Sequence, residues 1–323
     1  MKVSSDLRSR CWFQTGGSCA QLFEPESEED LGLALKEISQ SKRPFFILGR
    51  GSNSLVMDDF WDGAVLSMAR LQKVRLENES IICEAGVENT WIAEMAWSSG
   101  LEGVAWMNRL PGQMGATVRM NARCYGGEIS QVVSNIRAFD FQGQLVEIDV
   151  HSNPEKVFRS YKNTIFMDQQ LVVYEMTLDL KKGCKDSIRK KMDECEQDRL
   201  SRHQFDYPSC GCVFKNDYSP EVSVSSGFLL DLAGARDLST EHARVSPWHA
   251  NFIFNQGGGS REILELSLKM RELVWNEFGI WLDYEMEMLG QIPEDLKQQI
   301  NIVRKPDYKT AKLSEARRLF ASR

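Results

Sequence analysis

The chain has few of the residues that bind transition metals in proteins. Its 323 residues include only four histidines, no His-Glu-x-x-His motif and no pair of cysteines at CxxC spacing. Zinc sites usually need such clusters of histidine and cysteine. The sequence therefore argues against a zinc enzyme, and we expect no bound metal.

Long apolar runs and an excess of positive charge are also lacking. No apolar segment approaches the length of a membrane span, and the start of the chain lacks a segment of signal-peptide type. The net charge of −7 disfavours binding to nucleic acid through its phosphates. Eight cysteines without a secretion signal are typical of reduced thiols. We therefore expect a cytoplasmic protein that binds neither membrane nor nucleic acid.

The patterns along the chain mix helices with strands, and the length allows two or three domains. Ser27 and Asp30 are typical of a helix start, whereas Gly100 and Gly279 are typical of helix ends. The expected elements are helices over 89–99, 185–203 and 260–278, a hairpin over 136–148 turning at Gln142–Gly143, a strand over 174–180 with one buried face, and a strand over 281–289.

Two glycine-rich stretches are candidates for binding a polyphosphate. The first, Gly49–Asn53, follows the apolar run 45–48 and offers backbone N–H groups that can surround a phosphate. It is not a Rossmann motif, because Ser54 replaces the third glycine and no crossover helix is expected. The second stretch spans residues 110–127. Each alone is equally compatible with an ordinary turn, but together they favour a nucleotide cofactor.

Three side chains are candidates for chemistry. The Cys210-Gly211-Cys212 sequence lacks a partner pair for metal, but a thiol at Cys212 can donate a proton. Lys162, next to Tyr161, can pair with a carboxylate or phosphate. Glu285 belongs to the 281–289 strand. The ordinary alternatives remain open: a buried inert cysteine, a surface lysine and a solvated carboxylate on an edge strand.

In their order along the chain these segments resemble the FAD-dependent UDP-N-acetylenolpyruvoylglucosamine reductase (MurB) family. The resemblance spans roughly residues 10–290, and the short spacing from Lys162 to Cys212 resembles the subgroup that lacks an extra tyrosine-bearing loop. The segments that carry it are Leu48–Val56, Leu110–Gly115, Met120–Ala122, Tyr125–Glu128, Tyr161–Thr164, Pro208–Asn216, His249–Ile253 and Leu282–Gly290.

The resemblance implies an α+β fold, with a two-subdomain FAD-binding module of type 2 (PCMH-like) and a C-terminal α+β substrate domain. We expect subdomains at 1–70 and 71–200, a substrate-binding domain at 201–290 and a helical tail at 291–323. FAD is the implied cofactor, with NADPH as hydride donor. The implied cofactor-binding residues are Gly49, Arg50, Gly51, Ser52, Asn53, Pro111, Gly112, Gly115, Asn121 and Gly126.

The implied reaction reduces UDP-N-acetylglucosamine enolpyruvate to UDP-N-acetylmuramate, a step of peptidoglycan precursor synthesis. Cys212 matches the family's serine proton donor, Lys162 matches an arginine that binds and polarises the substrate, and Glu285 matches the third catalytic residue. The implied substrate contacts are Tyr161, Lys162, Asn216 and Asn251.

The departures from the family pattern leave two alternatives open. A thiol is a stronger acid than a hydroxyl, whereas lysine lacks the two-pronged guanidinium of arginine. Arg123 stands where the family usually has glycine, which would place a bulky cation near the flavin or its phosphates. The chain is then alternatively a related flavoenzyme with another substrate, or a non-catalytic paralogue that uses its basic tail for contacts. The sequence leaves the oligomeric state open.

Overall fold

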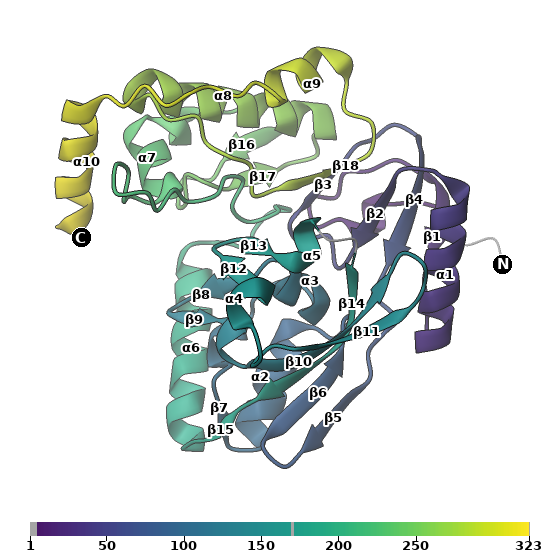
Figure 1. Ribbon diagram of the computed structural model, residues 1–323. Coiled ribbons are helices and arrows are strands. Elements are labelled where there is room, and N and C mark those ends of the chain that lie inside the picture. The colour runs from purple at the N-terminus through teal and green to yellow at the C-terminus, as the bar shows by residue number, and fades with distance from the viewer. Residues whose placement is uncertain (1–4, 169–170, 323) are drawn as a thin grey trace. The chain divides into compact units, whose positions relative to one another are not determined.

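The computed structural model describes residues 5–168 and 171–322, which form two units (Figure 1). Unit 1 contains Cys19–Arg50 and Asp62–Ser201, and unit 2 contains Ser5–Ser18, Gly51–Trp61 and Arg202–Arg323. The glycine turn 49–53 is thus divided between the two units. The division at residues 70, 200 and 290 stays a prediction. No helix of the described chain is long and apolar enough to cross a membrane.

The main sheet of unit 1 has five antiparallel strands in the order β11-β10-β14-β6-β5 (Figure 1). The predicted hairpin is confirmed as β10–β11, with Gly143 at φ +73° in its turn. The strands are β5 Val74–Glu77, β6 Ser80–Glu84, β10 Val133–Asp140, β11 Leu145–Asp149 and β14 Leu171–Asp179.

The central strand β14 differs from the prediction of one buried face. Every residue from Val172 to Met176 is buried. Val172 and Tyr174 belong to the core cluster built around helix α1, Glu28–Ser41, whereas Met176 belongs to the core on the other face. A strand covered on both faces loses its polar alternation, so the pattern understated its burial.

Helix α1 joins this sheet to the three-stranded sheet β1-β4-β2. The strands are β1 Cys19–Phe23, β2 Phe45–Leu48 and β4 Trp61–Ser67, and β2 and β4 run parallel. The predicted start of α1 is confirmed, because Ser27 Oγ accepts a hydrogen bond from Asp30 N at 3.1 Å.

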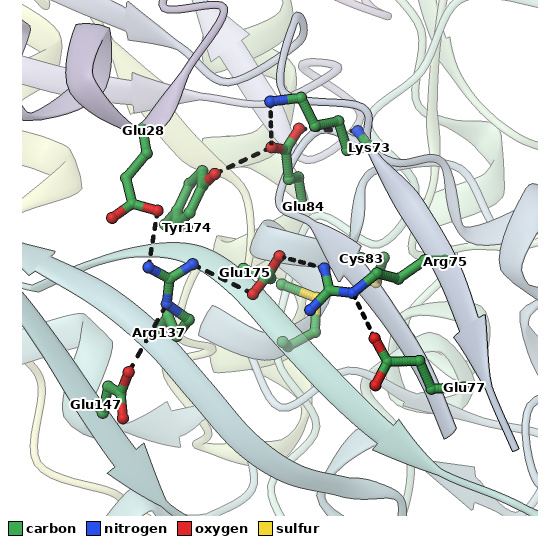
Figure 2. Close-up of polar contacts among 11 residues, drawn as sticks. Glu28, Lys73, Arg75, Glu77, Cys83, Glu84, Arg137, Glu147, Tyr174 and Glu175 are labelled. Carbon is green, nitrogen blue, oxygen red and sulfur yellow. Dashed lines mark hydrogen bonds and ion pairs between the residues drawn. The ribbon is translucent and has the colours of Figure 1, made fainter. Parts of the chain in front are cut away.

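A chain of ion pairs ties α1 to the five-stranded sheet (Figure 2). Arg137 on β10 contacts Glu28 of α1 at 2.7 Å and Glu175 of β14 at 3.3 Å. Arg75 of β5 approaches the other oxygen of Glu175 at 2.9 Å. Glu175 is only 9% exposed, so two guanidinium groups compensate one nearly buried carboxylate.

The remaining elements of unit 1 surround these sheets. The predicted helices are confirmed as α2 Asn89–Ser98 and α6 Lys185–Ser201, and α6 packs on α2 and on the 3-10 helix η2. The others are β7 Leu101–Glu102, η2 Ala105–Met107, α3 Met114–Arg119, β8 Arg123–Cys124, β9 Gly127–Glu128, η3 Ile129–Gln131, α4 Pro154–Val157, β12 Phe158–Ser160, β13 Asn163–Thr164, α5 Ile165–Asp168 and β15 Lys181–Lys182.

Unit 2 is built around the predicted helix α8, Ser260–Phe278, which ends at Gly279 with φ +70°. The predicted strand over 281–289 is shorter in the structure: only a bridge at Tyr284 and the strand β18 form. The other elements are η1 Arg8–Arg10, β3 Ser54–Val56, α7 Ser226–Leu232, η4 Ala235–Asp237, β16 Ala243–Val245, β17 Ile253–Asn255, β18 Glu287–Leu289, α9 Glu294–Ile300 and α10 Thr310–Ala321.

Candidate active site

In unit 1 the glycine that follows β2 faces a buried amide. A β-carbon on Gly49 would lie 3.2 Å from Oε1 of Gln113. Gln113 is 1% exposed, and this oxygen has no hydrogen-bond partner within the described chain. A buried acceptor without a hydrogen-bond partner is costly in free energy. The Gln113 oxygen can therefore accept a hydrogen bond from a ligand. Sequence reasoning missed Gln113, although it is the polar side chain within the glycine-rich 110–115 stretch.

The loop before α3 is held tightly against the end of β6. Gly112 has φ +120°, and its carbonyl oxygen accepts from Asn89 N at 3.2 Å. Gly115 N donates to the Ala85 carbonyl oxygen at 2.9 Å, and a β-carbon on Gly115 would approach that of Ala85 to 2.6 Å. Packing alone therefore requires glycine at 115, and Pro111 stands at the start of this fixed loop.

A second unpaired acceptor lies in the loop 121–127. Asn121 is 3% exposed and has φ +43°. Its Nδ2 donates to Glu128 Oε1 at 2.8 Å, but its Oδ1 has no partner among the described residues. Gly126 has φ +78° with no atom within 4 Å of its would-be β-carbon, so this part of the loop is open.

Tyr161 and Lys162 form the two-residue turn of the β12–β13 hairpin. Lys162 has φ +52°, and the hairpin is tied to α3 because Thr164 Oγ1 donates to the Arg119 carbonyl oxygen at 2.6 Å. The Arg123 guanidinium lies 4.3 Å from the centre of the Tyr161 ring, and Lys162 Nζ lies 5.9 Å from it. The structure thus brings two cations to one phenol.

The rest of the first glycine turn has structural partners of its own. Arg50, in unit 1, pairs with Glu88 at 3.3 Å. Gly51, in unit 2, has φ +64°, and a β-carbon there would clash with the Arg10 backbone. Ser52 is half-buried. The glycine at 51 is therefore explained by packing within unit 2.

In unit 2 the stretch 212–215 lies between two other segments. Val213 N donates to the Asn251 carbonyl oxygen at 2.9 Å, and Cys212 forms a bridge with Phe252. On the other side, Glu285 N donates to the Val213 carbonyl oxygen at 2.8 Å. The structure therefore brings the Cys212 and Glu285 segments together.

Asparagine side chains fix these segments from both sides. Asn251 is 1% exposed, and its amide accepts from Phe214 N at 3.0 Å and donates to Phe214 O at 2.8 Å. Asn53 Nδ2 donates to the Glu285 carbonyl oxygen at 3.0 Å. Asn216 accepts from Ser226 N at 2.9 Å. These three residues therefore organise the backbone of the site.

The neighbouring thiol at Cys210 differs from Cys212 in burial. Cys210 is 3% exposed, whereas Cys212 is half-buried. Burial raises the pKa of Cys210 well above its usual value, and the nearby groups of Cys11, Cys212 and Glu285 raise it further. Cys210 therefore stays protonated at neutral pH, and Cys212 is the more accessible of the two thiols.

The chain is similar in sequence and in structure to known proteins. A model described as FAD binding domain matches residues 19–149, and one described as UDP-N-acetylenolpyruvoylglucosamine reductase, C-terminal domain, matches residues 203–289. UDP-N-acetylenolpyruvoylglucosamine reductases from Clostridium novyi and Caldanaerobacter subterraneus are each 32% identical, covering 88% and 90% of this chain and 90% and 93% of theirs. The crystal structure of the Thermus caldophilus reductase (MurB) has a TM-score of 0.73 at 27% identity, covering 88% of this chain and 97% of that one. The expected α+β fold class is thereby confirmed.

Proposed function

The chain belongs to the UDP-N-acetylenolpyruvoylglucosamine reductase family, and from this premise we propose which of its residues carry the reaction. As a family member it is an FAD-dependent oxidoreductase that uses NADPH to reduce the enolpyruvyl group of a UDP-sugar, in peptidoglycan precursor synthesis. The family resemblance expected from the motif order is confirmed.

The residues of unit 1 fit FAD. The unpaired oxygens of Gln113 and Asn121 both lie within the stretch matched by the FAD-binding model. FAD carries imide and amino N–H groups and several hydroxyls, which can satisfy buried acceptors of this kind. When bound, the flavin supplies hydride transfer between NADPH and the enolpyruvyl double bond.

We assign the cofactor contacts according to this fit. Gly49, Gly112 and Gly126 allow close approach of the cofactor, and Gln113 joins Asn121 as an acceptor. Gly51 and Gly115 keep the loops in place. The proposed cofactor-binding set is Gly49, Arg50, Gly51, Ser52, Asn53, Pro111, Gly112, Gly115, Asn121 and Gly126, together with Gln113, and within it Gly51 and Gly115 act by shaping the loops rather than by direct contact.

The catalytic assignment follows from where charge develops. Hydride addition to the enolpyruvyl carbon produces an enolate conjugated with the carboxylate. The ammonium of Lys162 binds this carboxylate and stabilises the negative charge, with Tyr161 beside it. The thiol of Cys212 then donates a proton to the other carbon of the former double bond. The Glu285 carboxylate assists in this step.

The asparagines divide between binding and positioning. We assign Asn216, whose side chain accepts a hydrogen bond from Ser226 N at the start of α7, to contact the substrate. Asn251 was expected as a substrate contact, but its amide holds the Phe214 backbone on both sides. We therefore assign Asn251 to positioning Cys212. Asn53 belongs to the proposed cofactor-binding set and also positions Glu285.

The eight free cysteines support a reducing compartment, the cytoplasm.

Cofactor analysis and turnover test the proposal. The purified protein should carry FAD, and under anaerobic conditions it should oxidise more than about one NADPH per flavin only when UDP-N-acetylglucosamine enolpyruvate is added. Mass spectrometry should identify UDP-N-acetylmuramate as the product. If the protein binds FAD but does not reduce this substrate, the alternative of a flavoenzyme with another substrate is favoured. If it binds no flavin, the alternative of a non-catalytic paralogue is favoured.

A further inference from the structure

The last segment of the chain, which we call the C-terminal extension, comprises residues 291–322. It follows the stretch matched by the C-terminal domain model, which ends at residue 289. Its helices α9 and α10 both contact α8, and α10 also contacts α7 (Figure 1). Leu296, Leu313 and Ala316 are buried at 1–3% exposure. The extension is therefore packed into the core of unit 2.

Its first contact is with the side chain of Trp281, four residues before Glu285. Trp281 Nε1 donates to the Ile302 carbonyl oxygen of the extension at 2.7 Å. The buried Arg271 of α8 connects the same two segments: its Nε donates to Leu282 O at 2.7 Å and its Nη1 to Ile300 O at 2.9 Å. Three hydrogen bonds thus join residues 281–282 to the extension, directly or through Arg271.

Aromatic stacking strengthens this contact. The guanidinium of Arg304 lies 4.2 Å from the ring centre of Trp281 and 5.0 Å from that of Trp275. The guanidinium of Arg271 lies 4.2 Å from the same Trp281 ring. A guanidinium at this distance from an indole is attracted to its π electrons. Arg304 therefore fixes Trp281, four residues before Glu285.

The second contact is with the segment that carries Asn216. The Phe320 ring of α10 lies 5.2 Å from the Phe228 ring of α7, and Arg317 Nη1 donates to the Pro220 carbonyl oxygen at 3.3 Å. The backbone N of Ser226, at the start of α7, in turn holds Asn216. Both ends of the extension thus contact elements that support proposed site residues.

We propose that the C-terminal extension is a brace that positions Glu285 and Asn216, with Arg304 and Phe320 as its positioning residues. This inference rests on the proposed function of the two site residues. Displacement of Trp281 is transmitted along the backbone of residues 281–285 and through the hydrogen bond between Glu285 N and Val213 O, which reaches the Cys212 segment. Misplacement of reacting groups by about 1 Å can cost about a hundredfold in rate.

The test uses full-length holoenzyme carrying Arg304→Ala, Phe320→Ala or the conservative Arg304→Lys. Val303→Ser is the matched control, because Val303 precedes Arg304 and is 92% exposed. The flavin is reduced first, and its reoxidation by saturating enolpyruvyl substrate is then followed in H₂O and D₂O. We expect a loss of about tenfold or more in Arg304→Ala, a larger solvent isotope effect, and partial rescue in Arg304→Lys. FAD content and the Val303→Ser rate should match wild type.

Amide hydrogen exchange over residues 213–218 and 281–286 gives a second readout that does not need turnover. Faster exchange in Arg304→Ala and Phe320→Ala, with wild-type exchange in Val303→Ser, supports the brace even if wild type fails to turn over this substrate. That failure would refute the proposed function alone. Wild-type exchange in both alanine variants overturns the brace. The brace is also overturned if the loss in flavin reoxidation rate is proportional to the fraction of unfolded protein and the solvent isotope effect is unchanged.

Discussion

The guanidinium of Arg123 stacks on Tyr161, 4.3 Å from the ring centre, and also lies 3.9 Å from Glu128. Tyr161 is the residue before Lys162, the proposed partner of the substrate carboxylate. The pairing of Arg123 with a phenol and a carboxylate gives the side chain defined partners within unit 1. The expected closeness of this cation to the flavin or its phosphates stays a prediction, but its closeness to the Tyr161–Lys162 turn is a finding.

Replacing Arg123 should weaken substrate binding. Arg123→Ala removes a cation–π contact of about 1 kcal/mol, together with a positive charge beside Lys162. We expect the KM for the UDP-sugar to rise roughly fivefold, with a smaller effect at high salt. Steady-state kinetics at two salt concentrations measure it, with Arg123→Lys as the charge-retaining control. An unchanged or lower KM would show that Arg123 does not support the Tyr161–Lys162 turn.

Cys212 should be replaceable by serine but not by alanine. Cys212→Ala removes the proposed proton donor and should lower kcat by about a hundred- to ten-thousandfold. Cys212→Ser keeps a donor and should keep measurable turnover. Because a thiol ionises more readily than a hydroxyl, the cysteine enzyme should lose kcat at lower pH on the alkaline side than Cys212→Ser. Equal alkaline limbs in the two pH profiles would contradict the assignment.

Lys162 should be needed for its charge and improved by a guanidinium. Lys162→Met removes the group that we propose stabilises the enolate, and it should lower kcat by about a hundredfold or more. Lys162→Arg restores a planar fork that matches a carboxylate, so we expect a lower KM for the sugar substrate. Rapid-reaction measurements should locate the Lys162→Met defect in flavin reoxidation. If Lys162→Met reoxidises its flavin at the wild-type rate, Lys162 is an ordinary surface lysine without a catalytic role.

Local signals in the sequence predicted the local structure well. The cap at Ser27, the hairpin turn at Gly143 and the helix end at Gly279 each depend on the chemistry of one or two neighbouring residues. These elements formed where they were expected. The strand over 281–289 did not form fully, because its pairing depends on distant segments: Tyr284 bridges Phe214, and β18 pairs with β3.

Side-chain roles in the candidate site depended even more on distant partners. The type of residue at 113 or 251 does not reveal whether its amide is paired. Gln113 leaves a buried oxygen unpaired, whereas Asn251 places both amide atoms on the Phe214 backbone. Sequence order sufficed for the family, the FAD cofactor and the α+β class. The division of the 49–53 turn between two units followed only from tertiary contacts.

The thiols should differ sharply in their reaction with iodoacetamide. Cys184 is exposed, and hydrogen bonds from the backbone of Ser187 and Asp186 lower its pKa. A lowered pKa leaves more thiolate at neutral pH, and the thiolate is the species that reacts. Cys184 should therefore be modified first, and its rate should level off at a lower pH than that of a free cysteine. Cys210, whose pKa burial raises, should react only after unfolding. Peptide mass mapping tests this order, and early modification of Cys210 would contradict its burial.

The ion-pair chain of Figure 2 should contribute to the stability of unit 1 through Glu175. Arg137→Ala leaves this nearly buried carboxylate with Arg75 alone, and removing one partner of a buried pair is strongly destabilising. Because Arg75 remains, we expect a loss of about 2 kcal/mol in the free energy of unfolding. Arg75→Ala should cost less, since the Arg75 side chain is 52% exposed and its interaction is screened by solvent.

A double-mutant cycle separates the ion pair from other effects of Arg137→Ala. If the penalty comes from an uncompensated charge, Glu175→Gln in the Arg137→Ala background should recover part of the lost stability. Urea denaturation of the four proteins gives the coupling energy, and high salt should change it little because the carboxylate is nearly buried. Additive losses would instead assign the cost of Arg137→Ala to its contact with Glu28 at the start of α1.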